Sequence, residues 1–214
     1  MEFCFIRRII MDFKEISLAD FTGALASKTS VPGGGGASAL VASIGIALGD
    51  MVGEFTVGKK KYIDVEPEII KLMEKAQSLR EELLECINAD AVAFEPLSKA
   101  YAIPKDDPSR QQIMEKCLKD AAGVPFRILQ LGCEAIDLQR DFADKGSVIM
   151  ISDAATGVAL LEGAIKGAAI NVKINTKSMT DTEYANELNA KVDVLLKEYI
   201  EKARAIYTEV ANRI

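Results

Sequence analysis

The chain has 214 residues and a formal charge of -6 at pH 7, with 49% apolar residues, 6% aromatic residues and no tryptophan. This length allows one large domain, and a core of Ala, Ile, Leu, Val and Met suits close-packed helices. The acidic charge argues against a nucleic-acid partner, which requires a concentrated basic face. Histidine is absent, so Ser-His and Cys-His nucleophile systems are excluded and proton transfer falls to Asp, Glu, Lys, Tyr or a thiol.

The first residues do not have the pattern of a targeting signal. Arg7-Arg8 precede only three apolar residues before Asp12, which is too short for a signal sequence. We expect residues 1–12 to be an N-terminal extension, disordered or outside the native chain if translation starts at Met11, and residues 13–214 to form the domain.

Membrane insertion and metal binding are not expected either. The uncharged stretch 37–48 is shorter than the roughly 20 residues that span a bilayer. The four cysteines are isolated, without metal-ligand spacing, as is usual for small buried residues in a reducing compartment. We therefore expect a cytoplasmic protein with no metal site and no membrane partner.

The positions of helix-capping residues, glycines and prolines along the chain predict an all-α, single-domain bundle of about six helices, some of them long and kinked. Ser17, with Asp20 three residues on, caps a first short helix. A glycine run opens the second helix, which we expect to reach about Val57 and to end at Gly58. Glycines recur at every fourth position of this helix and predict a face for close helix packing: Gly45, Gly49 and Gly53.

Two long helices follow, each with an internal proline. The third begins at Pro67, a residue suited to the first helical position, and continues past Pro96 with a kink. Residues 101–108 contain two prolines and two aspartates and predict a loop. The fourth helix starts near Pro108, kinks at Pro125 and ends at Gly146.

The last two helices complete the bundle. We expect the fifth over about 147–172, a short extended piece over 171–174, and a linker over 175–179. Thr180, with Glu183 three residues on, is the pattern of a capping box for a final amphipathic helix that reaches the C-terminus.

The glycine run is the first candidate site. Gly33, Gly34 and Gly35 follow Pro32 and precede an apolar helix, so unpaired amides and the positive end of the helix dipole are available to a carboxylate or phosphate. A loop whose glycines only permit close packing is an equal alternative. The Lys-Ser/Thr pair of a nucleotide-binding P-loop is absent.

Two carboxylates lie on helix faces that should be apolar. Asp90 has Cys86, Ile87, Ala93 and Phe94 at three- and four-residue spacing, and Asp153 follows Ser152 in a nearly uncharged run. Burial raises the pKa of a carboxylate and suits it to proton transfer near neutral pH. The alternative is an aspartate that bonds a structural partner at a helix seam.

Lysines and asparagines provide further polar groups. Lys59, Lys60 and Lys61 follow the glycine helix and form either a solvated helix end or a docking patch for an anionic tail. Asn171 and Asn175 flank three residues and either bond a heterocycle or stabilise a chain bend.

Together these motifs resemble the cyclodeaminase/cyclohydrolase family of folate enzymes, from about residue 13 onward. No single motif is specific, but the ordered set is. The motifs occur in this order: Pro32-Gly33-Gly34-Gly35; Gly58-Lys59-Lys60 with Tyr62; Ala89-Asp90 with Ala93-Phe94; Val124-Pro125; Ser152-Asp153; and Gly167-Ala168 followed by Asn171-Val172 and Ile174-Asn175.

The resemblance implies a helical homodimer that processes one-carbon units on tetrahydrofolate, in its free or polyglutamylated form, and needs no cofactor beyond this substrate. It implies Asp90 as general acid/base and Asp153, with Ser152, as the group that orients the pterin or the attacking water. It further implies substrate-binding roles for the following residues: Gly33, Gly34, Gly35, Lys59, Lys60, Tyr62, Asn171 and Asn175.

Two activities of the family remain open at this stage. One hydrates methenyltetrahydrofolate to the formyl form, and the other closes formimidoyltetrahydrofolate with release of ammonia. No part of the chain resembles a formiminotransferase domain, which favours the cyclohydrolase; a non-catalytic folate-binding or scaffold dimer is the alternative from another class. Gly36 and Val57 depart from the family pattern and leave the details of the pocket open.

Overall fold

The computed structural model describes residues 11–214, so the predicted extension over 1–12 lies almost entirely outside the described residues. Within this part the chain forms helices and no strand, which confirms the all-α prediction. The helices are α1 (Leu18–Leu25), α2 (Gly34–Glu54), α3 (Glu66–Ala100), α4 (Arg110–Lys145), α5 (Ile151–Thr176) and α6 (Thr182–Ala211), with two short 3₁₀ helices, η1 (Lys60–Tyr62) and η2 (Val148–Met150).

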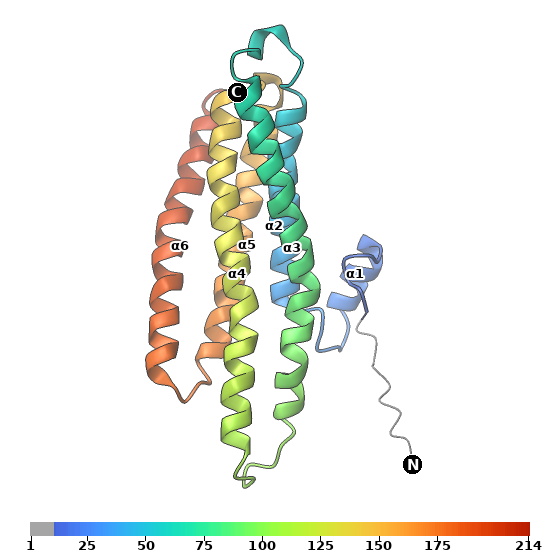
Figure 1. The fold of residues 1–214 in the computed structure, drawn as a ribbon, viewed down its shortest axis with the longest axis vertical. Helices are drawn as coiled ribbons and strands as arrows, with labels where there is room; N and C mark the ends of the chain where they lie inside the picture. The colour runs from blue at the N-terminus through green and yellow to red at the C-terminus, as the bar shows by residue number, and fades with distance from the viewer. Residues whose placement is uncertain (1–10) are drawn as a thin grey trace.

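The long helices α2 to α6 run along one axis, and α1 lies beside them (Figure 1). Helices α3, α4 and α6 form one layer, and α2 and α5 pack against it as a second layer. The core is aliphatic, as the composition predicts, and Phe142 of α4 is its largest fully buried side chain. Among the described residues, no element of the chain covers the outer face of the α2 and α5 pair.

Local signals place most helix boundaries. Ser17 caps α1 by accepting a hydrogen bond from the Asp20 N–H at 3.1 Å. Pro67 lies in the first turn of α3, and residues 101–109 form the predicted break before α4. Helix α2 ends at Glu54, earlier than expected, and a turn leads to Gly58, which has a φ of 76°. Both α3 and α4 continue through their internal prolines.

The extended piece predicted over 171–174 and the start of the linker at Asn175 are wrong, because α5 continues to Thr176. Each asparagine bonds back to the preceding turn: Asn171 Nδ2 donates to Gly167 O, and Asn175 Nδ2 donates to Asn171 O. Since Val172 between them is fully buried, packing outweighs the low helix propensity of asparagine.

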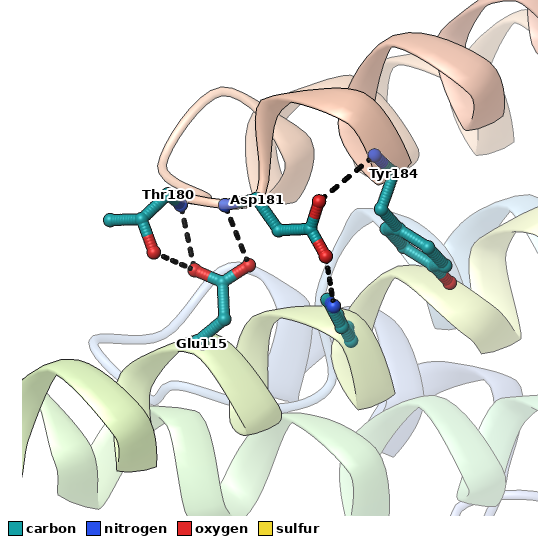
Figure 2. A network of polar contacts seen from close by, with 5 residues as sticks. Glu115, Thr180, Asp181 and Tyr184 are labelled. Carbon is teal, nitrogen blue, oxygen red and sulfur yellow. Dashed lines mark hydrogen bonds and ion pairs between the residues drawn. The ribbon is translucent and has the colours of Figure 1, made fainter.

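The cap of α6 is one residue later than predicted (Figure 2). Asp181 is the N-cap, and its carboxylate accepts a hydrogen bond from the Tyr184 N–H at 3.1 Å. Thr180 instead donates its N–H and its hydroxyl to Glu115 of α4, both at 2.7 Å. Lys119 of α4 pairs with Asp181 at 2.6 Å, so this network ties the linker before α6 to α4.

The glycine face of α2 packs as predicted. A Cβ at Gly45 would lie 2.8 Å from Leu161 Cγ and 3.0 Å from Gly157 O, so α2 and α5 cross closely here. Gln139 of α4 reaches into the same crossing and donates its amide N–H to Gly45 O at 2.6 Å. Gly49 and Gly53 face side chains of α4 and α3 at similarly short range.

Gly157→Ala is expected to lower the free energy of unfolding by about 1–3 kcal/mol. The added methyl would lie 2.6 Å from the backbone Gly45 O and would overlap the buried Gln139 amide, neither of which can move freely. Gly123→Ala is the matched control, because a Cβ at this exposed site of α4 meets nothing within 4 Å. We expect Gly123→Ala to raise the free energy of unfolding by about 0.5–1 kcal/mol, and denaturant unfolding of both variants tests this. Equal stability of the two variants would contradict the close crossing.

Two helical segments, Gly34–Glu54 and Val148–Thr176, are long and apolar enough to cross a membrane by length and composition alone. The uncharged stretch 37–48 lies within the first of these segments, which is longer than the stretch itself. In this structure both segments pack on each other and on the α3, α4 and α6 layer.

Candidate functional site

Asp90 lies against the glycine run at the start of α2. Its carboxylate Oδ2 accepts a hydrogen bond from the Gly36 N–H at 3.0 Å. The side chain is half-buried, and its neighbours Cys86 and Ile87 on α3 are buried, as predicted. A carboxylate of α3 therefore occupies the positive end of α2, where Gly33, the N-cap residue, supplies no side-chain cap.

The first turn of α2 requires glycine at positions 34 and 35, because side chains of α3 and α5 lie against its backbone. A Cβ at Gly35 would overlap the Asp90 carboxylate, and a Cβ at Gly34 would lie 2.8 Å from Asn171 Nδ2. The first turn of α2 thus passes between a carboxylate of α3 and an amide of α5. The first amides of a helix have no intrahelical acceptor, so this turn also presents N–H donors.

Further polar bonds, one within α2 and one from α5 to α4, hold this cluster in place. Ser38 is buried, and its hydroxyl donates to Gly34 O at 2.7 Å. Asn175 is buried and donates to Ala121 O of α4 at 3.0 Å, so it holds α5 rather than facing an open site. We name Gly33 to Gly36, Asp90, Asn171 and Asn175 the Asp90 cluster.

Burial raises the pKa of Asp90 above its ordinary value, and the hydrogen bond from Gly36 opposes this rise by stabilising the charged form. Among residues 11–214, no charged side chain contributes to this shift. The group is thus suited to hold and release a proton.

A second cluster lies at the other end of α2. Lys59 Nζ contacts Ser147 Oγ at 3.4 Å, and the Tyr62 hydroxyl accepts a hydrogen bond from the Val148 N–H at 3.1 Å. Lys60 is exposed in the same 3₁₀ turn. We name Lys59, Lys60, Tyr62, Ser147, Ser152 and Asp153 the Lys59 cluster.

Ser152 and Asp153 lie in the first turn of α5, shortly after Val148. Ser152 is exposed and Asp153 is half-buried. A carboxylate in the first turn of a helix is favoured by the dipole, so Asp153 also stabilises the start of α5.

The predicted site residues do not meet within one chain. Asp153 and Asn171 lie at opposite ends of α5, and 18 intervening steps of helix separate them by about 27 Å. The acid/base candidate Asp90 therefore lies at one end of the α2 and α5 layer, and the cationic Lys59 cluster lies at the other.

Sequence reasoning missed several residues that shape these clusters. The Gly36 amide, the Ser38 hydroxyl and the Ser147 side chain have no motif, because their roles depend on contacts with other helices. Asn88, two residues before Asp90, accepts a hydrogen bond from Phe13 N–H and donates one to Asp12, so it holds the segment before α1 against α3.

Comparison with known proteins identifies relatives along most of the chain. Residues 17–194 match the family model for formiminotransferase-cyclodeaminase. The chain is 35% identical over 202 residues to a methenyltetrahydrofolate cyclohydrolase of Methylorubrum extorquens, a match that covers 92% of this chain and 97% of that protein.

Other relatives are named as cyclodeaminases. The chain is 31% identical over 185 residues to the formimidoyltransferase-cyclodeaminase of Gallus gallus, covering 85% of this chain and 34% of that protein. The crystal structure of a formiminotetrahydrofolate cyclodeaminase from Thermotoga maritima superposes with a TM-score of 0.81 at 25% identity, over 92% of this chain and 98% of that one.

Proposed function

The chain belongs to the formiminotransferase-cyclodeaminase family, and from this premise we propose that it is a methenyltetrahydrofolate cyclohydrolase. The observation that carries the proposal is the 35% identity to the cyclohydrolase of Methylorubrum extorquens over nearly the full length of both proteins. The bifunctional relatives match over only about a third of their length.

The reaction adds water to the carbon that bridges two nitrogens of the methenyl form. One water proton leaves as the carbon–oxygen bond forms, a tetrahedral carbon results, and one carbon–nitrogen bond then breaks to give the formyl form. As that bond breaks, the hydroxyl on the carbon loses its proton to become the formyl oxygen and the leaving nitrogen takes up one proton, so one proton is released overall. This chemistry needs a group that accepts and returns a proton at one position.

Asp90 is the group that we assign to this step. Burial raises its pKa, so it is a stronger base toward the attacking water than an exposed aspartate and a usable acid toward the leaving nitrogen. Gly36 fixes the orientation of the carboxylate, and Asn171 lies across the first turn of α2 as a donor or acceptor for the pterin.

Formimidoyltetrahydrofolate cyclodeaminase is the second candidate, favoured by the fold match to the Thermotoga maritima enzyme. Both reactions pass through a tetrahedral carbon between two nitrogens, so the same aspartate serves either. The difference is whether water enters or ammonia leaves.

We further propose a homodimer in which each site takes residues from both chains. Within the described residues, the α2 and α5 layer leaves one face uncovered, and its helices carry exposed apolar side chains: Ile44 and Met51 of α2, Phe55 directly after α2, and Ile170 and Ile174 of α5. A second copy packed across this face by a two-fold axis perpendicular to α2 would run antiparallel to the first. The partner's Lys59 cluster would then lie beside the Asp90 cluster and supply cations for the anionic substrate.

Spectroscopy distinguishes the activities. The purified protein is mixed separately with methenyltetrahydrofolate and formimidoyltetrahydrofolate, and the methenyl absorbance and free ammonia are followed. We expect the absorbance to fall faster than the spontaneous rate, with no effect of a chelator. A rise in absorbance with ammonia would instead identify the cyclodeaminase, and folate binding without turnover of either substrate would contradict both.

A further inference from the structure

The turn between α4 and α5 is attached to the end of α2 by one buried hydroxyl. Thr56 follows α2 and is fully buried. Its Oγ1 donates to Val52 O at 2.6 Å and accepts a hydrogen bond from the Ser147 N–H at 2.8 Å. Ser147 is itself buried, so its N–H has no access to water as a replacement partner.

The same turn contacts the Lys59 cluster at two further points. The Ser147 hydroxyl lies 3.4 Å from Lys59 Nζ, and the Val148 N–H donates to the Tyr62 hydroxyl at 3.1 Å. Gly58, with a φ of 76°, redirects the chain between Thr56 and Lys59, and its N–H donates to Glu66 at 2.7 Å. The segment with the lysines is therefore held at both ends.

We infer that Thr56 is a positioning residue for substrate binding: its hydroxyl sets where Lys59 and Tyr62 lie relative to Ser152 and Asp153 at the start of α5. Thr56 is too deeply buried to touch substrate. This inference rests on the proposed function, because it assumes that the Lys59 cluster binds the folate.

A positioning role differs from a purely structural one in what the kinetics report. Thr56→Val keeps the shape but leaves the Ser147 N–H buried without an acceptor, so the turn must shift to satisfy it. The shift would displace Lys59 and Tyr62 near the C-terminal end of α2. It would not displace Asp90 of α3, which contacts the N-terminal end of α2. Thr56→Ser keeps the hydroxyl and serves as the conservative rescue.

The test compares Thr56→Val, Thr56→Ser and Ser43→Ala in the full chain, with methenyltetrahydrofolate as substrate. Ser43 is the control, because its buried hydroxyl bonds Leu40 O within its own helix. We expect Thr56→Val to raise KM about 10-fold with kcat changed less than about 3-fold, while the other two variants stay near the original protein. Hydrogen exchange at the Ser147 amide should accelerate in Thr56→Val alone.

Each other outcome has a distinct meaning. An original protein that turns over neither folate overturns the proposed function, and the hydrogen-exchange measurement then still reports on the turn. An active original protein with an unchanged KM in Thr56→Val overturns the positioning role. If thermal unfolding shows that a smaller folded fraction accounts for the weaker activity of Thr56→Val, the positioning role is also overturned. A Thr56→Ser variant with a KM as high as that of Thr56→Val overturns it too.

Discussion

Asp90→Asn is expected to lower kcat for methenyltetrahydrofolate hydration at least about 100-fold, with folate still bound. The substitution removes the proton-accepting carboxylate and keeps an oxygen that can accept the hydrogen bond from the Gly36 N–H. Stopped-flow absorbance gives kcat, and direct titration gives folate affinity. A variant that retains more than about a third of the original kcat would contradict a role in proton transfer and leave Asp90 as the cap of α2.

Asp50→Asn is the matched control for this variant. Asp50 is a half-buried aspartate of α2 whose pKa is also raised, mainly by burial, and it lies 3.6 Å from Arg80 outside both clusters. The control makes the same chemical change in a similar environment. We expect its kcat to stay within about 3-fold of the original protein.

Stability and catalysis respond differently to Asp90→Asn. Because the folded state raises the pKa of Asp90, the folded chain binds this proton more tightly than the unfolded chain. The resulting stabilisation is fully present below the ordinary pKa of aspartate and is lost as pH rises through the raised value. Thermal unfolding at several pH values should therefore show that the stability of Asp90→Asn rises relative to that of the original protein as pH increases across this window.

The fold was largely predictable because its signals are local. Ser17 caps α1 through its own backbone neighbours, and Pro67 marks the start of α3 whatever packs against it. The errors occur where tertiary contacts decide. Because Val172 is buried in the core, α5 stays helical through Asn171 and Asn175. Thr180 donates its hydroxyl to Glu115 of α4, so Asp181 rather than Thr180 caps α6.

The site was predictable as residues but not as an arrangement. Asp90 could be singled out because its helical neighbours are apolar, which is a property of α3 alone. Its contact with Gly36 depends on how α2 packs across α3, and the sequence has no signal for that. The distance between Asp90 and Asp153 follows from the antiparallel packing of α2 and α5, so a list of motifs in one order could not reveal that they lie apart.

Mixing two inactive chains is expected to restore activity if the site is shared between protomers. Asp90→Asn and Asp153→Asn should each be nearly inactive as homodimers. A heterodimer of the two contains one site with both substitutions and one site with neither, so it should recover about half the activity of the original dimer. Co-expression with two different affinity tags isolates the heterodimer, and its size in solution confirms the assembly.

The reciprocal pairing supplies the control. A chain with both substitutions, paired with an original chain, places one substitution in each shared site, so this heterodimer should be inactive. If each site used both aspartates from one chain, the results would reverse: the doubly substituted pair would retain about half the activity and the first pair none. Within a chain, Asp153 lies about 27 Å along α5 from Asn171, and Asn171 lies across the first turn of α2 from Asp90, so we expect the first pattern. The contrast requires that each substitution alone nearly abolishes activity, which the two singly substituted homodimers measure directly.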